Sequence, residues 1–264
     1  MSAYRPLLET FTRTPAGWAV NITDNWKQGR TIYGGLTAGL CYEAAIRSHN
    51  DLPPLRSLQI SFIGPVTDNP VITTRLLRQG RNVTAIQTDM HIGDQIVASA
   101  TLLFGQSRES VLTVGRPAPQ ASLPEQTDPF FPDAATPFLP PFTQNFDVRL
   151  IEGSRPMMGA ERGYMRTWAR HKNKASQDGL SSFITIGDVM PPAALPMFKT
   201  MGPVSSMNWQ VNFLKDICQT DEGWWHIELD LTASENGYSS QIMRYWNTAG
   251  ELFAEATQSV TIFI

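Results

Sequence analysis

The stretch GLSSFITIGDVMPPAALPMFKTMGPVSSMNWQVNF, from Gly179 to Phe213, decides how this chain is organised. Its first part predicts a helix from 179 to 190, because the apolar residues are almost unbroken and Pro191-Pro192 stop it. One ionisable residue, Asp188, falls four residues after Ile184 and so shares its face. A carboxylate on a buried stripe is costly unless it is paired or used. On this stretch alone, a functional role and a plain helix end beside the prolines both stay open.

Length and charge exclude several classes of protein. The chain has 264 residues, enough for one large domain or two small ones, and a net charge of −3 without a basic cluster. This charge argues against nucleic acid as a partner. The start, MSAYRPLLETF, lacks the layout of a signal peptide, and no apolar run is long enough to span a membrane. We therefore expect a cytoplasmic protein with no membrane partner, in which Cys41 and Cys218 are free thiols.

The chain contains two copies of one pattern. The first copy, within 1–105, predicts a strand, a helix opened by Gly34-Gly35, and four further strands; the expected ranges are 17–23, 34–47, 55–63, 71–77, 83–92 and 96–104. A proline-rich linker or surface crossing follows at 106–144. The second copy, 145–264, repeats the order; the expected ranges are 146–151, 163–169, the helix 179–190, 204–213, 225–233, 238–246 and 252–264.

Short motifs support a duplication. The stretch Ser57-Leu58-Gln59 is similar to Ser206-Met207-Asn208, which starts 149 residues later. The stretch from 96 to 101 is similar to the one from 252 to 257, at an offset of 156 residues. Each match alone is weak, but the same order across five segments favours two tandem copies.

The last strand distinguishes the two copies. One face of it is apolar except for Gln258, and the same face in the first copy has Leu102 at that place. A buried amide must be hydrogen-bonded, either to the backbone at a strand end or as part of a site. Ser206 is a weaker candidate, because strict alternation puts it on a polar face with Asn208 and Gln210.

The layout resembles the double hotdog fold, an α+β architecture in which two tandem repeats each wrap an antiparallel sheet around a helix. It is most similar to the acyl-CoA thioesterase II family. The markers are Gly34-Gly35, SLQISFIGPV at 57–66, Asp188 after an apolar helix, S-x-N at Ser206, and A-x-A-T-Q ending at Gln258. In that family an Asp, a Ser or Thr, and a Gln from the second repeat hold a hydrolytic water. The resemblance implies these roles for Asp188, Ser206 and Gln258.

The expected chemistry is hydrolysis of a thioester without a metal or cofactor. Asp188 would take the proton of the water, and the Gln258 amide oxygen and the Ser206 hydroxyl would orient it. Backbone N–H groups near Gly34-Gly35 would suit the oxyanion, by analogy. Gln59 is a candidate for substrate binding, although family members often have His there, and Asn208 stands where they have an acidic residue.

Other chemistries have little support in the sequence. No GxSxG elbow is present, the four histidines have no metal-ligand spacing, and no phosphate-binding glycine loop occurs. Asp221 and His226 have the spacing of hotdog-type hydratases, but we interpret them as surface turn residues. Two functions remain: an acyl-CoA thioesterase of fatty acid metabolism, and a non-catalytic acyl-binding or assembly protein. In either case we expect a homodimer or higher oligomer, because exposed sheet edges would be covered by a partner.

Overall fold

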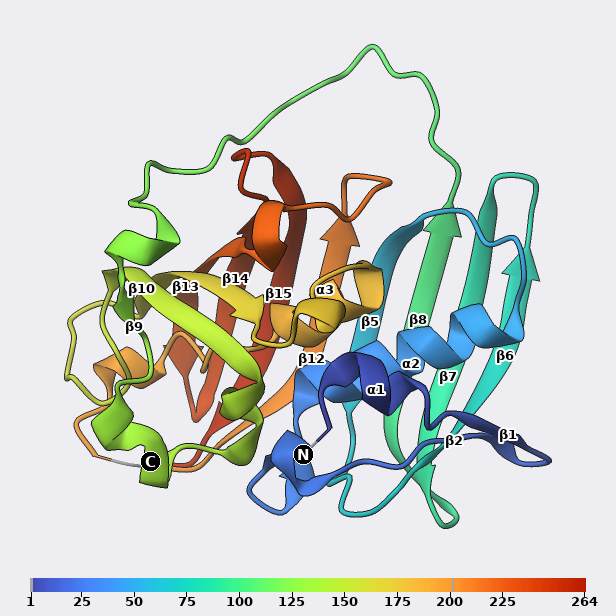
Figure 1. The fold of residues 1–264 in the computed structure, drawn as a ribbon, viewed down its shortest axis with the longest axis horizontal. Helices are drawn as coiled ribbons and strands as arrows, with labels where there is room; N and C mark the ends of the chain where they lie inside the picture. The colour runs from blue at the N-terminus through green and yellow to red at the C-terminus, as the bar shows by residue number, and fades with distance from the viewer. Residues whose placement is uncertain (1, 201) are drawn as a thin grey trace.

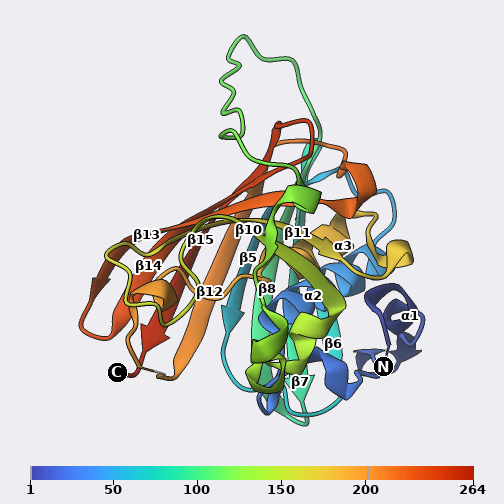
Figure 2. The same cartoon turned by 60° about the vertical axis from the view of Figure 1, so that its left-hand side comes forward.

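The computed structural model describes residues 2–200 and 202–264, in which one large antiparallel sheet wraps around the helices α2 and α3. The sheet has 13 strands in the order β1-β2-β6-β7-β8-β5-β12-β15-β14-β13-β11-β10-β9. The helices α2 and α3 lie against one face, which we call the inner face (Figures 1 and 2). This arrangement is the double hotdog fold that the sequence predicts.

Most elements lie where the sequence predicts them. The first copy consists of α1 (Tyr4–Leu8), β1 (Thr12–Thr14), β2 (Gly17–Ala19), β3 (Lys27–Gln28), β4 (Thr31–Ile32), α2 (Gly34–Ser48), β5 (Leu55–Phe62), β6 (Val71–Gln79), β7 (Val83–Ile92) and β8 (Gln95–Gly105). The second copy consists of β10 (Phe146–Gly153), β11 (Tyr164–His171), α3 (Leu180–Gly187), β12 (Val204–Phe213), β13 (Trp225–Glu235), β14 (Tyr238–Trp246) and β15 (Leu252–Ile262).

The helix in the second copy is shorter than the sequence predicts. It ends at Gly187, and Asp188 has already left helical geometry with φ −102° and ψ 14°. Gly187 lies against the ring of Trp209, which a Cβ at position 187 would approach to 3.0 Å. Asp188 is therefore the residue that follows the helix, and it does not continue the helix face of Ile184 as the sequence predicts.

The two copies are joined through their central strands, β5 and β12, which pair antiparallel with Gln59 opposite Gln210. Each of these strands has a bulge near its start, between Leu55 and Ser57 in β5 and between Ser206 and Asn208 in β12. The matching bulges make Ser206 the equivalent of Leu55, an offset of 151 residues. The offset of 149 inferred from the motifs is therefore wrong by two residues. The offset of 156 for the last strands agrees with the register.

The helices α2 and α3 touch closely because two glycines of α2 carry no side chain. A Cβ at Gly35 would overlap the carbonyl oxygen of Thr185, and one at Gly39 would overlap its hydroxyl. The Tyr33 hydroxyl donates a hydrogen bond of 2.9 Å to the same Thr185 carbonyl. Since Gly39 also faces the Ser181 carbonyl, the two helices run antiparallel across the seam between the copies.

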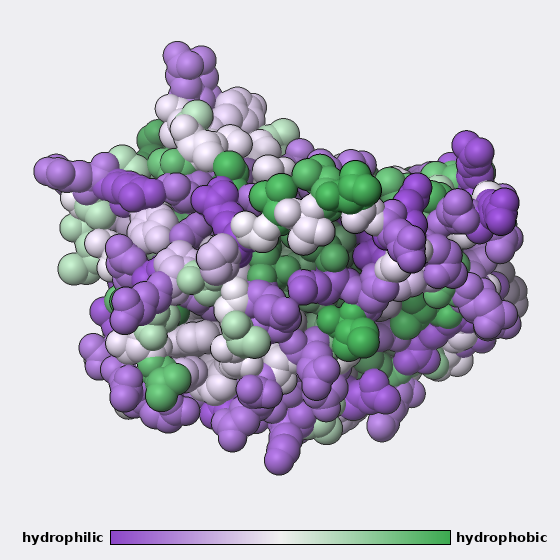
Figure 3. All heavy atoms as spheres, turned by 90° about the horizontal axis from the view of Figure 1, so that it is seen from above, coloured by the Kyte–Doolittle hydropathy of each residue, from purple (hydrophilic) through white to green (hydrophobic). Residues whose placement is uncertain are grey.

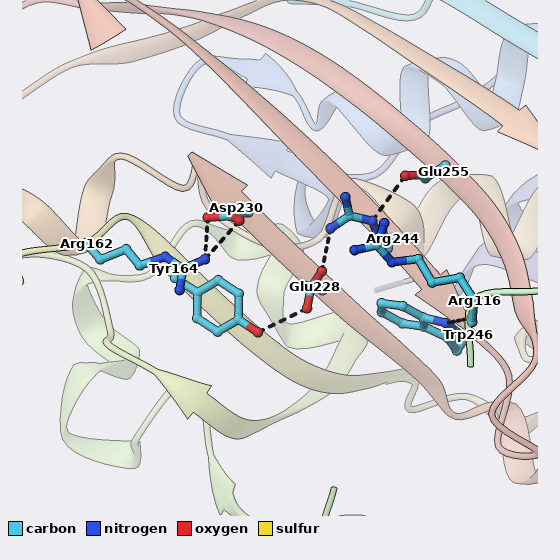
Figure 4. A network of polar contacts seen from close by, with 8 residues as sticks. All are labelled: Arg116, Arg162, Tyr164, Glu228, Asp230, Arg244, Trp246 and Glu255. Carbon is cyan, nitrogen blue, oxygen red and sulfur yellow. Dashed lines mark hydrogen bonds and ion pairs between the residues drawn. The ribbon is translucent and has the colours of Figure 1, made fainter. Parts of the chain in front are cut away.

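The proline-rich segment between the copies is held at residues 116–122 against the outer face of the second copy, and its end packs through Phe142 on Tyr33, which precedes α2. It contains η2 (Pro124–Gln126), β9 (Asp128–Pro129), η3 (Asp133–Phe138) and η4 (Pro141–Asn145). The indole N–H groups of Trp246 and Trp168 donate to the carbonyls of Arg116 and Ser122, at 2.8 Å each. Ion pairs and hydrogen bonds join the neighbouring strands of this face (Figure 4).

The helix contact supplies a test of the packing. Gly39→Ala places a methyl group where the Thr185 hydroxyl lies, so we expect a loss of about 1–3 kcal/mol in the free energy of unfolding. Gly115→Ala is the matched control, because nothing lies within 4 Å of a Cβ at that exposed position. Urea unfolding measures both. Equal stability of the two variants would contradict a close contact between the helices.

Candidate active site

Asp188 lies where the end of α3 meets the inner face of the sheet and the start of α2. One carboxylate oxygen accepts a hydrogen bond of 2.9 Å from Nε2 of Gln258 in β15. The other oxygen lies beside Gly34, where a Cβ would come within 2.7 Å of it. Three segments far apart in the sequence therefore converge on this carboxylate, and Gly34 leaves the space that it occupies.

Gln258 belongs to a chain of hydrogen bonds whose direction is fixed. The backbone N–H of Ala193 donates to Oε1 of Gln241 at 2.7 Å, and Nε2 of Gln241 donates to Oε1 of Gln258 at 2.8 Å. A backbone N–H can only donate, so each amide in turn is oriented with its NH₂ group toward the next acceptor. Both glutamines are buried, with exposed fractions of 1% for Gln241 and 4% for Gln258. This chain of hydrogen bonds ends at Asp188, to which Gln258 presents its NH₂ group.

This orientation bears on the role expected for Gln258. The Gln258 amide oxygen, expected to orient a water, is already bonded to Gln241. The group that Gln258 presents to Asp188 is its NH₂, which carries two hydrogens and uses one of them on the carboxylate.

The surroundings of Asp188 raise its pKa to about 7, chiefly because burial penalises the charged carboxylate. The hydrogen bonds from Gln258 and from the backbone N–H of Gly35 act in the opposite direction. The residue as a whole is half-buried. A carboxylate with a pKa near neutral pH is suited to accept a proton.

The same place in the first copy is entirely apolar. In β12, β15 and β14 the inner-face row is Trp209, Gln258 and Gln241. The equivalent row in β5, β8 and β7 is Leu58, Leu102 and Ile86, each fully buried. The asymmetry between Leu102 and Gln258 in the sequence therefore extends to the neighbouring strand, where Gln241 corresponds to Ile86.

Ser206 lies on the inner face, contrary to the expected alternation. The bulge at Met207 inserts one extra residue, so Ser206 pairs with the buried Val260, whereas Asn208 stays exposed. Ser206 is half-buried and makes no hydrogen bond with Asp188 or Gln258 within the described residues. Its pairing with Val260 places Ser206 in the row of residues next to the one that contains Gln258.

Two other sequence interpretations need correction. Gln59 is exposed on the outer face, opposite Gln210, whereas its neighbours Leu58 and Ile60 point to the inner face. It does not belong to the cluster around Asp188. His226, interpreted as a surface turn residue, is 1% exposed and lies in β13 between Trp168 and Trp246.

Sequence reasoning missed Gln241 and the backbone of Ala193. Gln241 alternates with Ser239, Met243 and Tyr245 in β14 and is the large polar member of that buried face, as Gln258 is in its own strand. The same test, applied to every strand of the second copy, would have found it. The Ala193 contact depends on how the Pro191-Pro192 turn folds back over β14, which no local pattern specifies.

Comparison with protein families matches both halves of the chain. Residues 22–105 match the acyl-CoA thioesterase N-terminal domain, and residues 119–262 match the acyl-CoA thioesterase C-terminal domain. The chain therefore belongs to the acyl-CoA thioesterase family, and its fold is the double hotdog. The second match begins at 119, within the segment that is bonded to Trp246 and Trp168.

Solved structures share the fold over the full chain. A conserved protein of unknown function with a hotdog fold from Alicyclobacillus acidocaldarius is 22% identical, with a TM-score of 0.87 and coverage of 100% of this chain and 99% of that chain. The tesB protein of Mycobacterium avium subs paratuberculosis is 18% identical, with a TM-score of 0.78 and coverage of 98% and 97%. The acyl-CoA thioesterase II TesB2 of Mycobacterium marinum is 14% identical, with a TM-score of 0.75 and coverage of 97% and 96%. A search of curated protein sequences found no match.

Among the described residues, no helix is long and apolar enough to cross a membrane.

The buried carboxylate supplies a test based on stability. Because the folded state raises the pKa of Asp188 to about 7, its ionisation costs stability progressively between about pH 4 and pH 7. Asp188→Asn removes this cost, so we expect the variant to be more stable than the wild type by about 2–4 kcal/mol at pH 8. The difference should vanish near pH 4, as measured by chemical unfolding across pH. A gain that did not depend on pH, or one equal to that of the exposed-site control Asp221→Asn, would contradict the raised pKa.

Proposed function

We propose that this protein hydrolyses an acyl-CoA thioester to a free acid and CoA, with Asp188 as the general base. The observation that carries the proposal is the carboxylate with a pKa near 7, to which a directed chain of two buried amides donates. The first copy has only apolar residues in the equivalent row, so the proposed chemistry belongs to one site per chain.

The proposed reaction needs an aimed water and a proton acceptor. Asp188 takes a proton from the water while the water oxygen attacks the thioester carbonyl carbon. The tetrahedral intermediate then expels the CoA sulfur, which receives the proton from Asp188. General base catalysis of this kind typically contributes about 10²- to 10⁴-fold. The second hydrogen of the Gln258 NH₂ group is the donor that we assign to the water oxygen.

The remaining roles are assigned from position. Ser206, half-buried on the inner face beside Val260, is assigned to the water as a second polar contact. The start of α2 lies against the carboxylate, and the N–H of Gly35 is directed at Asp188. We assign the neighbouring N–H of Gly34 to the carbonyl oxygen, which gains negative charge at a helix N-terminus. Assembly of two or more chains stays a prediction.

The decisive measurement is thiol release from acyl-CoA substrates of short, medium and long chain. We expect kcat to rise with pH up to about 7 and then level off, because Asp188 must be ionised to accept a proton. Asp188→Asn should lower kcat by at least about 10²-fold without loss of folding. Asp221→Asn, a change in an exposed carboxylate, should leave kcat unchanged. If no chain length gives release above background, the acyl-binding alternative replaces this proposal.

A second variant tests the amide chain. Gln241→Leu removes the donor that orients Gln258, so the Gln258 amide is free to turn its oxygen toward Asp188. We expect kcat to fall about 10-fold and the pH profile to move upward, because the hydrogen bond that lowers the Asp188 pKa is lost. Ser240→Ala, an exposed change one residue away in β14, is the control. A loss of kcat with an unchanged pH profile would mean that Gln241 only supports packing.

A further inference from the structure

A cavity of about 950 Å³ lies at the other end of the helix pair, away from Asp188. It is lined by the end of α2, the start of α3 and the connections that follow α2 and β12. The eight residues of α3, about 12 Å of helix, separate its position from Asp188. Both copies contribute to its walls, as both contribute to the candidate active site.

The helix contact relates this cavity to the active site by an approximate two-fold axis. Gly35 faces Thr185 and Gly39 faces Ser181 across the seam. An axis that exchanges these two contacts maps Gly39 onto Thr185 and Gly35 onto Ser181. Both pairs differ by 146 residues, and so do the residues that precede the helices, Tyr33 and Gly179. With this offset Tyr42 is the equivalent of Asp188, and Leu180 is the equivalent of Gly34.

The sheet gives the same relation independently. The matching bulges make Leu55 the equivalent of Ser206, and the strand register makes Phe104 the equivalent of Val260. Tyr42, Leu180, Leu55 and Phe104 all line the cavity. The cavity is therefore the counterpart of the active site, formed by the opposite ends of the same elements.

The residues that would carry the chemistry have been replaced in the counterpart. Tyr42 stands for Asp188, and burial raises the pKa of its phenol well above the ordinary value, so it accepts no proton near neutral pH. Leu55 stands for Ser206, and Leu102 stands for Gln258. The positions that would hold a water are filled with apolar side chains.

What remains is a cavity suited to an acyl chain. Its volume lies in the range of small-molecule sites, about 300–1,000 Å³. Its apolar walls include Ile46, Leu52, Leu180 and Phe253. The charged residues of its lining are Lys215, Asp51 and Asp216, and Asp216 is paired with Arg56. Nε2 of His49, another lining residue, is buried and has no hydrogen-bond partner among the described residues. Figure 3 views the molecule from this end and shows hydrophobic side chains around a hollow in a mostly hydrophilic surface.

We propose that this cavity is a second, non-hydrolytic site that binds an acyl chain with a polar head, as free acid or as thioester. The inference rests on the proposed function for the class of ligand, because the counterpart site would handle an acyl group. An acyl group bound here is not cleaved, since the base and the amide are absent from the equivalent positions. A ligand bound at this site contacts the end of α2 and the start of α3.

Cys218 lines the cavity and is half-buried, whereas Cys41 is fully buried elsewhere in the core, so the Cys218 thiol reports on occupancy. The experiment measures the rate at which N-ethylmaleimide modifies Cys218 in the Asp188→Asn protein, in which we expect hydrolysis to be at least about 10²-fold slower. Dodecanoic acid and dodecanoyl-CoA are the two probes. We expect at least one of them to slow the modification about 5-fold or more, and the comparison between them shows whether acid or thioester is preferred. Absence of protection by both would overturn the proposal.

Ile46→Trp fills the cavity and should abolish the protection, whereas Ile46→Val should retain it. Leu52→Trp, in the connection after α2, repeats the test without a change in the helix. Protection that persists in both Trp variants would overturn the proposal, because the ligand would then be bound elsewhere. On the wild-type background Ile46→Trp should keep kcat within about twofold. Because protection is read without turnover, a failure of hydrolysis and a failure of this site give different results.

Discussion

The close contact between α2 and α3 is the constraint on which the rest of the site depends. Gly35 and Gly39 let Thr185 approach the backbone of α2, and this contact brings the end of one helix to the start of the other. Asp188 then lies beside Gly34 and the Gly35 N–H, although the sequence separates them by about 150 residues. A larger side chain at either glycine would move the carboxylate away from the amide that β15 supplies. The packing of the two helices and the position of the Asp188 carboxylate therefore depend on the same two glycines.

The chain of hydrogen bonds from Ala193 through Gln241 to Gln258 fixes the orientation of the Gln258 amide. A single glutamine beside a carboxylate can turn either end toward it, and the two orientations differ little in shape. A backbone N–H at the far end removes this freedom without any charged group. Both amides are satisfied without a charged donor, so the burial that raises the Asp188 pKa is preserved.

Much of the fold could be predicted from the sequence, because alternation and turn residues are local signals. The duplication, the order of strands, and the asymmetry between Leu102 and Gln258 all follow from such patterns, and so does the choice of Asp188. The direction in which Ser206 points could not be predicted, since it depends on a bulge at Met207 that reverses the alternation. The partner of Gln258 depends on strand register and on the packing of the Pro191-Pro192 turn, which involve distant segments. The exposed position of Gln59, between the buried Leu58 and Ile60, follows from alternation.

The covalent link between the copies has a consequence for how such a molecule can change over time. In a dimer of identical single repeats, every substitution appears twice, so an exchange of glutamine for leucine would affect both sites at once. In this chain Leu58, Leu102 and Ile86 can differ from Trp209, Gln258 and Gln241 because each half is encoded separately. The divergence is also hard to reverse. A glutamine restored at position 102 alone would be buried next to leucine and isoleucine without the second amide and the backbone donor that satisfy Gln258.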